Sequence, residues 1–568
     1  MSNITFVTTF LNIYEIKYND RDLEWRFKHF KKIAKTGVQI VLYCSTDCFI
    51  ELENILNEYS NIKFIKYVDI KDTWTYKICE SVENLEPLKL HVEKNTKEYI
   101  ILQNTKIEFL KDAIEINPWN STHFAWIDFS IFHIFENNEK YATELIKKIS
   151  KTQFNDKILI IPGCWNRNQF NYESLISNIV WRFCGGFFIG DIESIMNFHK
   201  LYELHFKNFL EKSKKLVWEV NFWAYLELEH HLSISWYKAD HNISIIEIPP
   251  SLSCIKLNIE KSFNYTQFNS STKLPEIENF LPTSTCFLRF KGINLINVRY
   301  VNYWIYPNGG YLIKEPNGHI YTKNMSCLLN DGFEIIQSNE MMDDSIQLKN
   351  NGGNIYGIED IRLYELNDEI YFLGSNKNFS QNGNIRIIHG KYNINKMTYD
   401  DCKMIVPPNK DSWCEKNWVP FVKNGRVFFI YSWWPFQIGI INEKNDGQQM
   451  FSQLDIILTS QHVTPIFSRV RGSTPFIETV DGFIGLVHFS EETVPRTYYH
   501  LLVLLDKDTF MPLKYSNHFY FNKMSIEFCI GFDIKDDNYH FWISNFDRDP
   551  ELIITNKTNL QLCNYILY

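Results

Sequence analysis

The feature that most constrains the fold is a change of hydrophobic period near Pro249-Pro250. Before it, short apolar runs such as Ile4–Phe10, Val38–Tyr43 and Ile62–Tyr67 alternate with segments of helical period. Strands separated by helices in this way are typical of an α/β layer with a mainly parallel sheet. We therefore predict an α/β domain of Rossmann type over residues 1–249.

The rest of the chain has a different pattern. The Ser-, Thr- and Asn-rich stretch 250–282 predicts a linker. From 283 to 568 strand-like runs dominate, and turns such as Asn308-Gly309 and Asn424-Gly425 join them in pairs. Because the pairs repeat at roughly 45–60 residues, they predict an all-β domain, a five-bladed β-propeller.

Within the first half, further strands are expected at Tyr99–Leu102 and Phe124–Ile127. The spacing of apolar residues predicts helices over Arg21–Thr36, Asp47–Tyr59, Tyr141–Ser150, Glu173–Trp181, Ile192–Lys212 and Phe222–His230.

Charge and cysteine usage exclude several classes of protein. The formal net charge is −9, which argues against a dedicated nucleic-acid binder, because such proteins neutralise phosphates with a basic surface. The 12 cysteines are scattered without a Cys-x-x-Cys pair, as in a reducing cytoplasm. The N-terminus resembles a strand and not a signal peptide, and no run is long enough to span a bilayer. We expect a cytoplasmic protein, in the host cytoplasm if the source is a virus, and the sequence leaves the oligomeric state open.

Two features of the first half suggest chemistry. Asp128 follows the strand-like Phe124–Ile127, and an acid at a strand's carboxyl end can hold a divalent ion that bridges a diphosphate. The alternative is a helix cap. Gly185-Gly186 would let a ligand approach the backbone closely, or would simply form a tight turn.

Two further acids are candidates. Glu219 lies between Trp218 and Trp223, where a carboxylate among aromatic rings could have the raised pKa of a general base. The alternative is an ordinary acid at the start of a helix. Asp240 and His241 could add a metal or phosphate contact.

Taken in order, these stretches resemble the HtrL/YibB family, proposed glycosyltransferases with a GT-A-like fold. The resemblance rests on Phe6–Phe10, Arg26, Trp126–Asp128, Gly185–Phe188 and Trp218-Glu219, and it covers about 1–249. It implies a nucleotide-sugar donor, with Asp128 in the place of the family's reduced Asp-x-Asp motif and Mn²⁺ or Mg²⁺ as the divalent cation. The donor-binding residues would be Thr8, Arg26, Gly185, Gly186, Asp240 and His241, with Glu219 as the catalytic base.

The second half has its own candidate motif, Glu359-Asp360-Ile361-Arg362. On a strand Asp360 and Arg362 share a face, where a guanidinium beside a carboxylate can bind sugar hydroxyls or phosphate. A structural ion pair is the alternative. Other polar residues recur along the predicted blades and would converge on an axial pocket: Arg299, Asn302, Glu415, Arg471, His488, Tyr499, His500 and Glu527.

This half is similar to the five-bladed propellers of the β-mannoside phosphorylase superfamily, glycoside hydrolase family 130, and related mannosyltransferases. The Glu359–Arg362 segment resembles their Glu-Asp-Pro-Arg signature, with Ile361 where Pro is usual. The resemblance covers about 285–560. It implies Asp360 and Arg362 as sugar-binding residues, with Arg471, His488 and His500 near a phosphate. Asp360 is our candidate for the catalytic residue of this half.

The sequence therefore predicts a glycosyltransferase that passes a sugar from a nucleoside diphosphate sugar to a glycan acceptor, with a second carbohydrate-active module. One alternative is a glycoside hydrolase or phosphorylase that works through the propeller. Another is a propeller that only binds glycans.

Overall fold

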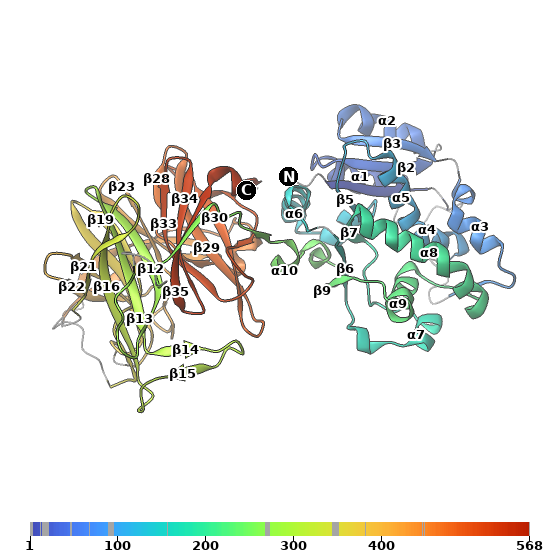
Figure 1. Cartoon of the computed structure of the whole chain (residues 1–568). Coiled ribbons are helices and arrows are strands. Elements are labelled where there is room, and N and C mark those ends of the chain that lie inside the picture. The colour runs from blue at the N-terminus through green and yellow to red at the C-terminus, as the bar shows by residue number, and fades with distance from the viewer. Residues whose placement is uncertain are drawn as a thin grey trace. The chain divides into compact units, whose positions relative to one another are not determined.

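The computed structural model describes residues 4–11, 13, 22–45, 48–67, 69–88, 96–155, 157–266, 273–342, 352–380, 382–445, 447 and 449–566. Contacts divide the chain into two compact units, Met1–Ser253 and Cys254–Tyr568 (Figure 1). The first unit is mixed α/β and the second is all-β in its sheets, so the predicted change of fold class is confirmed.

The first unit is built on a seven-stranded sheet with the order β3-β2-β1-β5-β7-β6-β9. Pairing is parallel except at β7, which runs antiparallel to both β5 and β6. All residues of β1 and β5 are buried, as in a sheet with both faces covered. The strands are β1 (Ile4–Phe10), β2 (Ile40–Ser45), β3 (Ile62–Tyr67), β5 (His123–Ile127), β6 (Leu159–Gly163), β7 (Phe187–Asp191) and β9 (Ser235–Lys238).

Helices follow most of these strands, and side chains cap several of them. Asp22 accepts from the backbone N–H of Trp25 at the start of α1, and Asp191 accepts from that of Ser194 at the start of α8. The helices of eight residues or more are α1 (Leu23–Ala34), α2 (Phe49–Glu58), α4 (Lys97–Asn104), α5 (Lys106–Ile116), α6 (Glu139–Lys151), α8 (Ile192–Ser213) and α9 (Glu219–Glu229); α3 (Trp74–Glu80) and α7 (Tyr172–Ser177) are shorter.

One expected strand is a helix. Tyr99–Leu102 lies inside α4, which Thr96 caps by accepting from the backbone N–H of Tyr99. Its apolar run Tyr-Ile-Ile-Leu has a high strand propensity, but tertiary packing overrides propensity in short segments. The helix α5 follows directly and packs on β1 and β5. The sequence pattern missed α5, and with it the residue that organises the site described below.

The strand order reverses at β1. The chain continues from β1 to β2 and β3 on one side, and β5 lies on the other side of β1. Ligands bind at such a point, outside the carboxyl ends of the strands, in open α/β sheets. Phe10 ends β1 and Asp128 follows β5.

The second unit consists of antiparallel strand groups. In the described residues the groups are β12-β13-β16-β17, β19-β20-β21-β22, β23-β24-β25-β26, β27-β29-β30-β32 and β33-β34-β35. A short parallel pairing of Ile405 and Val406 with β26 joins the second and third groups into one eight-stranded sheet.

The groups pack on each other in sequence order and the last packs on the first. β12 contacts β19, β19 contacts β23, β23 contacts β28, β29 contacts β33, and β33 contacts β12. The first strand of each group is β12 (Leu281–Phe290), β19 (Glu359–Leu366), β23 (Val419–Lys423), β27 (Arg471–Gly472) and β33 (Glu527–Lys535). The other strands of the groups are β13 (Ile293–Val301), β16 (Ile320–Leu329), β17 (Ile335–Glu340), β20 (Glu369–Asn376), β21 (Arg386–Asn393), β22 (Thr398–Val406), β24 (Arg426–Trp433), β25 (Phe436–Asn445), β26 (Met450–Ser460), β28 (Ile477–Thr479), β29 (Gly482–Glu491), β30 (Thr497–Leu505), β32 (Phe519–Tyr520), β34 (Asn538–Asn545) and β35 (Arg548–Asn556).

The segment expected as a linker contributes strands to this unit. β10 (Ile255–Lys256) pairs with β32, and β11 (Lys261–Asn264) pairs with β35. Tyr265 and Leu274 are buried, and Tyr265 donates to the main-chain oxygen of Phe333. The polar composition of 250–282 concealed these few apolar positions.

No helix in the described part of the chain has the length and apolarity that crossing a membrane requires.

Candidate functional site in the first unit

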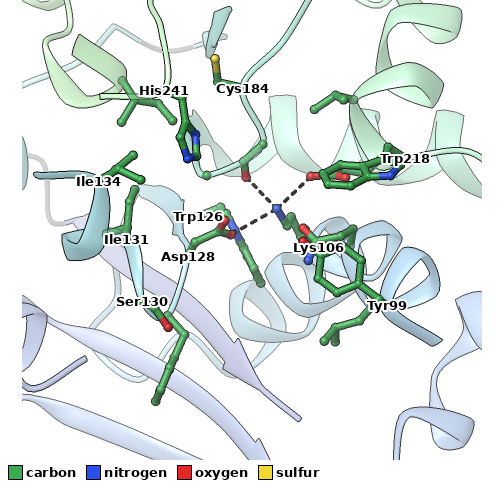
Figure 2. Close-up of a pocket in the computed structure, with 18 of the residues that line it drawn as sticks. Tyr99, Lys106, Trp126, Asp128, Ser130, Ile131, Ile134, Cys184, Trp218 and His241 are labelled. Atoms are coloured by element: carbon green, nitrogen blue, oxygen red, sulfur yellow. Dashed lines mark hydrogen bonds and ion pairs between the residues drawn. The ribbon is translucent and has the colours of Figure 1, made fainter. Parts of the chain in front are cut away.

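A cavity of about 1120 Å³ opens at the carboxyl ends of β1 and β5 (Figure 2). Thr9 and Phe10 of β1 and Asp128 after β5 contribute to its wall. Aromatic rings make up much of the remainder: Trp25, Tyr99, Trp126, Trp165, Trp181 and Trp218. A large concave site with aromatic walls and a few charged groups is the usual form of a small-molecule site.

Lys106 lines this cavity, and its side chain is 3% exposed. Its Nζ donates to Glu219 Oε1 at 2.9 Å and to the main-chain oxygen of Gly185 at 2.9 Å, and it lies 3.1 Å from Asp128 Oδ1. Figure 2 shows these three contacts converging on one nitrogen. An ammonium has three N–H groups, so each of them has an oxygen partner here.

The burial of Lys106 is compensated by its partners. Burial alone would lower the pKa of this amine, but the charges of Asp128 and Glu219 outweigh burial and raise the pKa. Lys106 is therefore a cation at neutral pH. The ring of Trp126 lies 5.7 Å from Nζ and adds a cation–π contact.

Glu219 is the buried member of the group. It is the first residue of α9 and is 2% exposed. Burial raises the pKa of its carboxyl group, and Lys106 opposes that rise. Its second oxygen, Oε2, is buried and has no hydrogen-bond partner among the described residues. Glu219 thus acts mainly as the counter-ion of Lys106.

Asp128 is the accessible member. Its side chain is 42% exposed, and its Oδ1 also accepts from Trp126 Nε1 at 2.7 Å. Two donors on one oxygen hold the carboxylate in a fixed orientation. Its other oxygen, Oδ2, lies on the side of Gly186, where a Cβ on that glycine would come within 3.5 Å of it.

The surroundings of Gly185 and Gly186 give a structural reason for glycine at these positions. Antiparallel pairing of β5 with β7 brings Gly186 beside Asp128, whose N–H donates to the main-chain oxygen of Gly186 at 2.9 Å. A Cβ on Gly185 would lie 2.1 Å from Glu219 Oε1, whereas a Cβ on Gly186 would lie 3.2 Å from its nearest neighbour, Ile245. Only glycine at 185 leaves room for the Lys106–Glu219 pair.

The structure brings most of the predicted donor-site residues to the cavity. Arg26, Gly185, Gly186, Asp240 and His241 line it. The guanidinium of Arg26 lies 5.7 Å from the ring centre of Phe10. Asp240 Oδ1 accepts from the backbone N–H of His241.

Thr8 differs from the others. Its side chain is fully buried in β1 and does not line the cavity, whereas the next residues along the strand, Thr9 and Phe10, do.

The residues around Asp128 do not fit a divalent cation. Mg²⁺ and related ions bind several oxygen ligands at short range, and carboxylates usually supply the charge. Here Asp128 Oδ1 is already shared by Lys106 and Trp126. Among the described residues, no group of three or more His, Cys, Asp and Glu side chains could hold a metal ion.

Sequence reasoning missed Lys106, and it missed Trp25 and Trp165 of the cavity wall. The signal available was weak: a lysine next to Ile107, Phe109 and Leu110, all of which are buried. With Tyr99–Leu102 read as a strand, nothing placed Lys106 at the start of a helix facing Asp128.

Charged groups in the second unit

A second group of charged residues lies where the strand groups of the second unit meet. Arg299 Nη1 lies 2.9 Å from Asp360 Oδ1, and its Nη2 lies 3.3 Å from Glu359 Oε1. Lys416 lies 3.3 Å from Glu359 Oε2. Three strand groups therefore supply one ionic cluster, of which sequence reasoning missed Lys416.

Asp360 has an unusual backbone, with φ of +50° at an irregularity in the β19–β20 register. Burial would raise the pKa of its carboxyl group, but Arg299, Lys416 and Arg362 outweigh burial and lower it. Asp547 lies near the same groups, accepts from Tyr303 at 3.0 Å, and has a pKa raised by burial.

Arg362 does not form the expected fork with the Asp360 carboxylate. Its Nη1 donates to the main-chain oxygen of Asp360, its Nε to that of Ser473, and its Nη2 to Asn417 Oδ1. The positive φ at Asp360 breaks the alternation of side chains that the prediction assumed. Arg362 is 3% exposed, and its hydrogen bonds link β19 to the segments at Asn417 and Ser473.

Other predicted residues of this half have structural partners. Asn302 bonds the backbone of His319 and Tyr321, and Glu415 accepts from Trp418 Nε1. Glu527 accepts from the backbone N–H groups of 521–523, and burial raises its pKa to about 7.

The remaining predicted residues are three buried rings and one exposed cation. Tyr499 packs near Phe489, and burial lowers the pKa of His500 to about 3. His488 is also buried, shares a hydrogen bond with Ser473 Oγ, and has a lowered pKa. Neutral imidazoles of this kind do not supply positive charge to a phosphate. Arg471 is exposed.

Comparison with known proteins

Residues 2–215 match the family model HtrL_YibB, described as a bacterial protein of unknown function. This confirms the resemblance seen in the first part of the sequence. No curated protein matches the chain.

Solved structures similar to this chain include mannoside phosphorylases and glycoside hydrolases, and the matches cover its C-terminal part. A β-1,2-mannobiose phosphorylase from Listeria innocua has 13% sequence identity and a TM-score of 0.32, and the match covers 50% of this chain and 92% of that one. A mannose phosphorylase from Leishmania mexicana has 11% identity and a TM-score of 0.32, covering 55% of this chain and 92% of that one.

Proposed function

We propose that the first unit is a glycosyltransferase of GT-A-like fold that transfers a sugar from a nucleoside diphosphate sugar to a glycan hydroxyl. The observation that carries this proposal is the aromatic-lined cavity at the β1–β5 switch point, with one oriented, accessible carboxylate on its wall. A site of this kind offers flat apolar faces to a nucleobase and a base to an acceptor.

Aromatic rings are suited to the nucleobase. Trp218 contacts Tyr99 and Trp181 edge-on, with ring centres 5.6 and 5.9 Å apart. Base stacking on such rings tolerates any nucleobase, so it supports a nucleotide and leaves its identity open. Arg26 and His241 line the same cavity and can face a diphosphate.

The geometry favours Asp128 over Glu219 as the general base. In the transfer, the acceptor oxygen bonds to the anomeric carbon, the bond from that carbon to the diphosphate breaks, and the acceptor proton passes to the base. A base must come within hydrogen-bond reach of that proton. Asp128 lines the cavity with a side chain that is 42% exposed, whereas Glu219 is 2% exposed and paired with Lys106.

Calorimetric titration of the full chain with common nucleoside diphosphates and their sugars tests the proposal. We expect binding of at least one of these compounds. Asp128→Asn should abolish sugar transfer, whether or not it weakens that binding. Asp72→Asn, a change at an exposed aspartate outside the cavity, is the matched control. Absence of binding for every nucleotide at millimolar concentration contradicts the proposal.

For the second unit, we propose a five-bladed β-propeller that handles glycosides. The closed series of contacts among five strand groups supports the propeller, and β11 pairing with β35 completes the last group. The cluster of Arg299, Glu359, Asp360 and Lys416 supports a carbohydrate site, because charged hydrogen-bonding groups from several blades converge there.

The second unit has two candidate activities: cleavage of a glycosidic bond by water or phosphate, and glycan binding alone. A panel of mannosides assayed with and without phosphate separates them, since only phosphorolysis needs phosphate and only catalysis releases sugar. Lys416→Met removes the most accessible cation of the cluster and should reduce binding in either case.

A further inference from the structure

We infer that the cavity of the first unit needs no divalent cation, because the ammonium group of Lys106 takes the place that a metal ion would occupy. This inference rests on the proposed function for its biological meaning. Its structural content, that Asp128 is held by an internal cation, can be tested without any substrate.

The first argument is coordination. Lys106 Nζ has three oxygen neighbours within 3.1 Å, from Asp128, Glu219 and the main chain of Gly185. Two carboxylates and one carbonyl are also a set that a hard divalent cation prefers. The chain thus places a lysine at the centre of an oxygen-ligand set.

The second argument is charge. A metal ion bound to Asp128 would lie about 2.1 Å from its oxygen, close to a buried ammonium of the same sign. Lys106 is 3% exposed and cannot move into solvent without leaving Glu219 buried and unpaired. The ammonium and a metal ion therefore exclude each other.

The third argument is fit. Gly185 leaves no room for a side chain next to the Lys106–Glu219 pair, and Trp126 Nε1 donates to the same Asp128 oxygen that Lys106 contacts. The ion pair is part of the packed structure of α5, α9 and the β5–β7 connection. This arrangement fixes the charge of the site before any ligand arrives.

The test titrates the full chain with Mn²⁺ alone, and electron paramagnetic resonance measures the Mn²⁺ that is bound. We expect Asp128→Asn to bind as much Mn²⁺ as the wild-type chain, because Asp128 holds no ion in the wild type. Lys106→Met leaves two carboxylates without their cation and should gain a Mn²⁺ site. Mn²⁺ should also raise the melting temperature of this variant, by mass action. Adding Asp128→Asn to Lys106→Met should abolish the gain.

The wild-type comparison decides the inference even if Lys106→Met does not fold. Wild-type Mn²⁺ binding that disappears in Asp128→Asn overturns it. A folded Lys106→Met chain that binds no more Mn²⁺ than the wild type also overturns it, because the lysine would then not be standing in a metal site.

A nucleotide titration separates this inference from the proposed function. Equal nucleotide affinity in EDTA and in Mn²⁺ supports both. Binding that requires Mn²⁺ supports the transferase and overturns the inference. When no nucleotide binds in either buffer, the transferase proposal fails, and the Mn²⁺ measurement still decides the role of Lys106.

Discussion

At the scale of single residues, the candidate site depends on how close three charged groups and one glycine lie. Lys106 contacts Glu219, Asp128 and the main chain of Gly185, and a Cβ at 185 would meet Glu219 at 2.1 Å. Buried ion pairs are sensitive to such displacement, because losing one partner leaves the other charge uncompensated.

Gly185→Ala should therefore destabilise the first unit by about 1–3 kcal/mol, the usual cost of overpacking a well-filled site. The added methyl group would push Glu219 away from Lys106. Chemical denaturation measures the loss. Gly186→Ala is the matched control, since its Cβ would have more space, 3.2 Å to Ile245. Equal stability of the two variants would contradict the tight fit described at Gly185.

Arg362 gives a second residue-scale prediction. Its guanidinium donates to two main-chain oxygens and to Asn417, so Arg362→Ala should cost about 3 kcal/mol or more in the stability of the second unit. Unfolding by denaturant measures this loss. Arg471→Ala, at an exposed arginine, serves as the control. A folded Arg362→Ala chain of wild-type stability that has lost glycan binding would favour the ligand-binding role instead.

At the scale of elements, sequence patterns predicted the strands and helices whose apolar residues recur at a regular spacing. The strands Ile4–Phe10 and Phe124–Ile127 and the long helix from Ile192 were evident, because buried strands and amphipathic helices leave regular apolar spacing. The site was partly predictable for a related reason: Asp128, Gly185 and Glu219 adjoin element ends, where side chains converge.

Other features left no periodic signal. Tyr99–Leu102 was read as a strand because a short apolar run has no distinctive period, and this hid α5 and Lys106. The positive φ at Asp360 broke the strand alternation on which the pairing with Arg362 was predicted. Both depend on tertiary contacts between distant residues.

The strand β30 gives a prediction about pH. Burial lowers the pKa of His500 to about 3, below its unfolded value near 6.5. The unfolded chain therefore binds a proton below pH 6.5 that the folded chain does not. For this reason the free energy of unfolding decreases as pH falls from 6.5 toward 3. Between pH 7 and pH 5 the loss from this residue should be about 2 kcal/mol.

His500→Phe should remove that part of the pH dependence. The ring already packs against Phe519 and Phe521, so a phenyl group suits the site. Urea unfolding at pH 7 and pH 5 measures the difference for both chains. A variant that loses as much stability as the wild type on acidification would show that His500 is protonated in the folded state.

The strand β11 predicts where the second unit can be cut. It pairs with β35 through four residues, and the adjacent Tyr265 is buried and bonded to Phe333. A fragment 254–568 should fold, whereas a fragment 283–568 should lose this strand and expose the edge of β35, which promotes aggregation. Size-exclusion chromatography and circular dichroism compare the two fragments. A monomeric, folded 283–568 fragment would show that β11 is dispensable.

At the scale of the whole molecule, each unit has its own core and its own charged site. A large buried cluster around Phe198, Phe222 and Trp223 holds the first unit together, and separate clusters around Phe483, Phe541 and Phe372 stabilise the second. Units with separate cores usually unfold in separate steps, and stability changes at distant independent sites add.

We therefore predict two calorimetric transitions for the full chain, each altered by its own set of variants. Gly185→Ala should lower the melting temperature of one transition, because it disturbs the Lys106–Glu219 pair of the first unit. Arg362→Ala should lower only the other, because its partners at Asp360, Asn417 and Ser473 all belong to the second unit. A nucleotide that binds the first cavity should raise only the first transition, by mass action. A single transition that both variants shift together would show instead that the two units fold as one cooperative body, and the two sites would then have to be studied as a coupled pair.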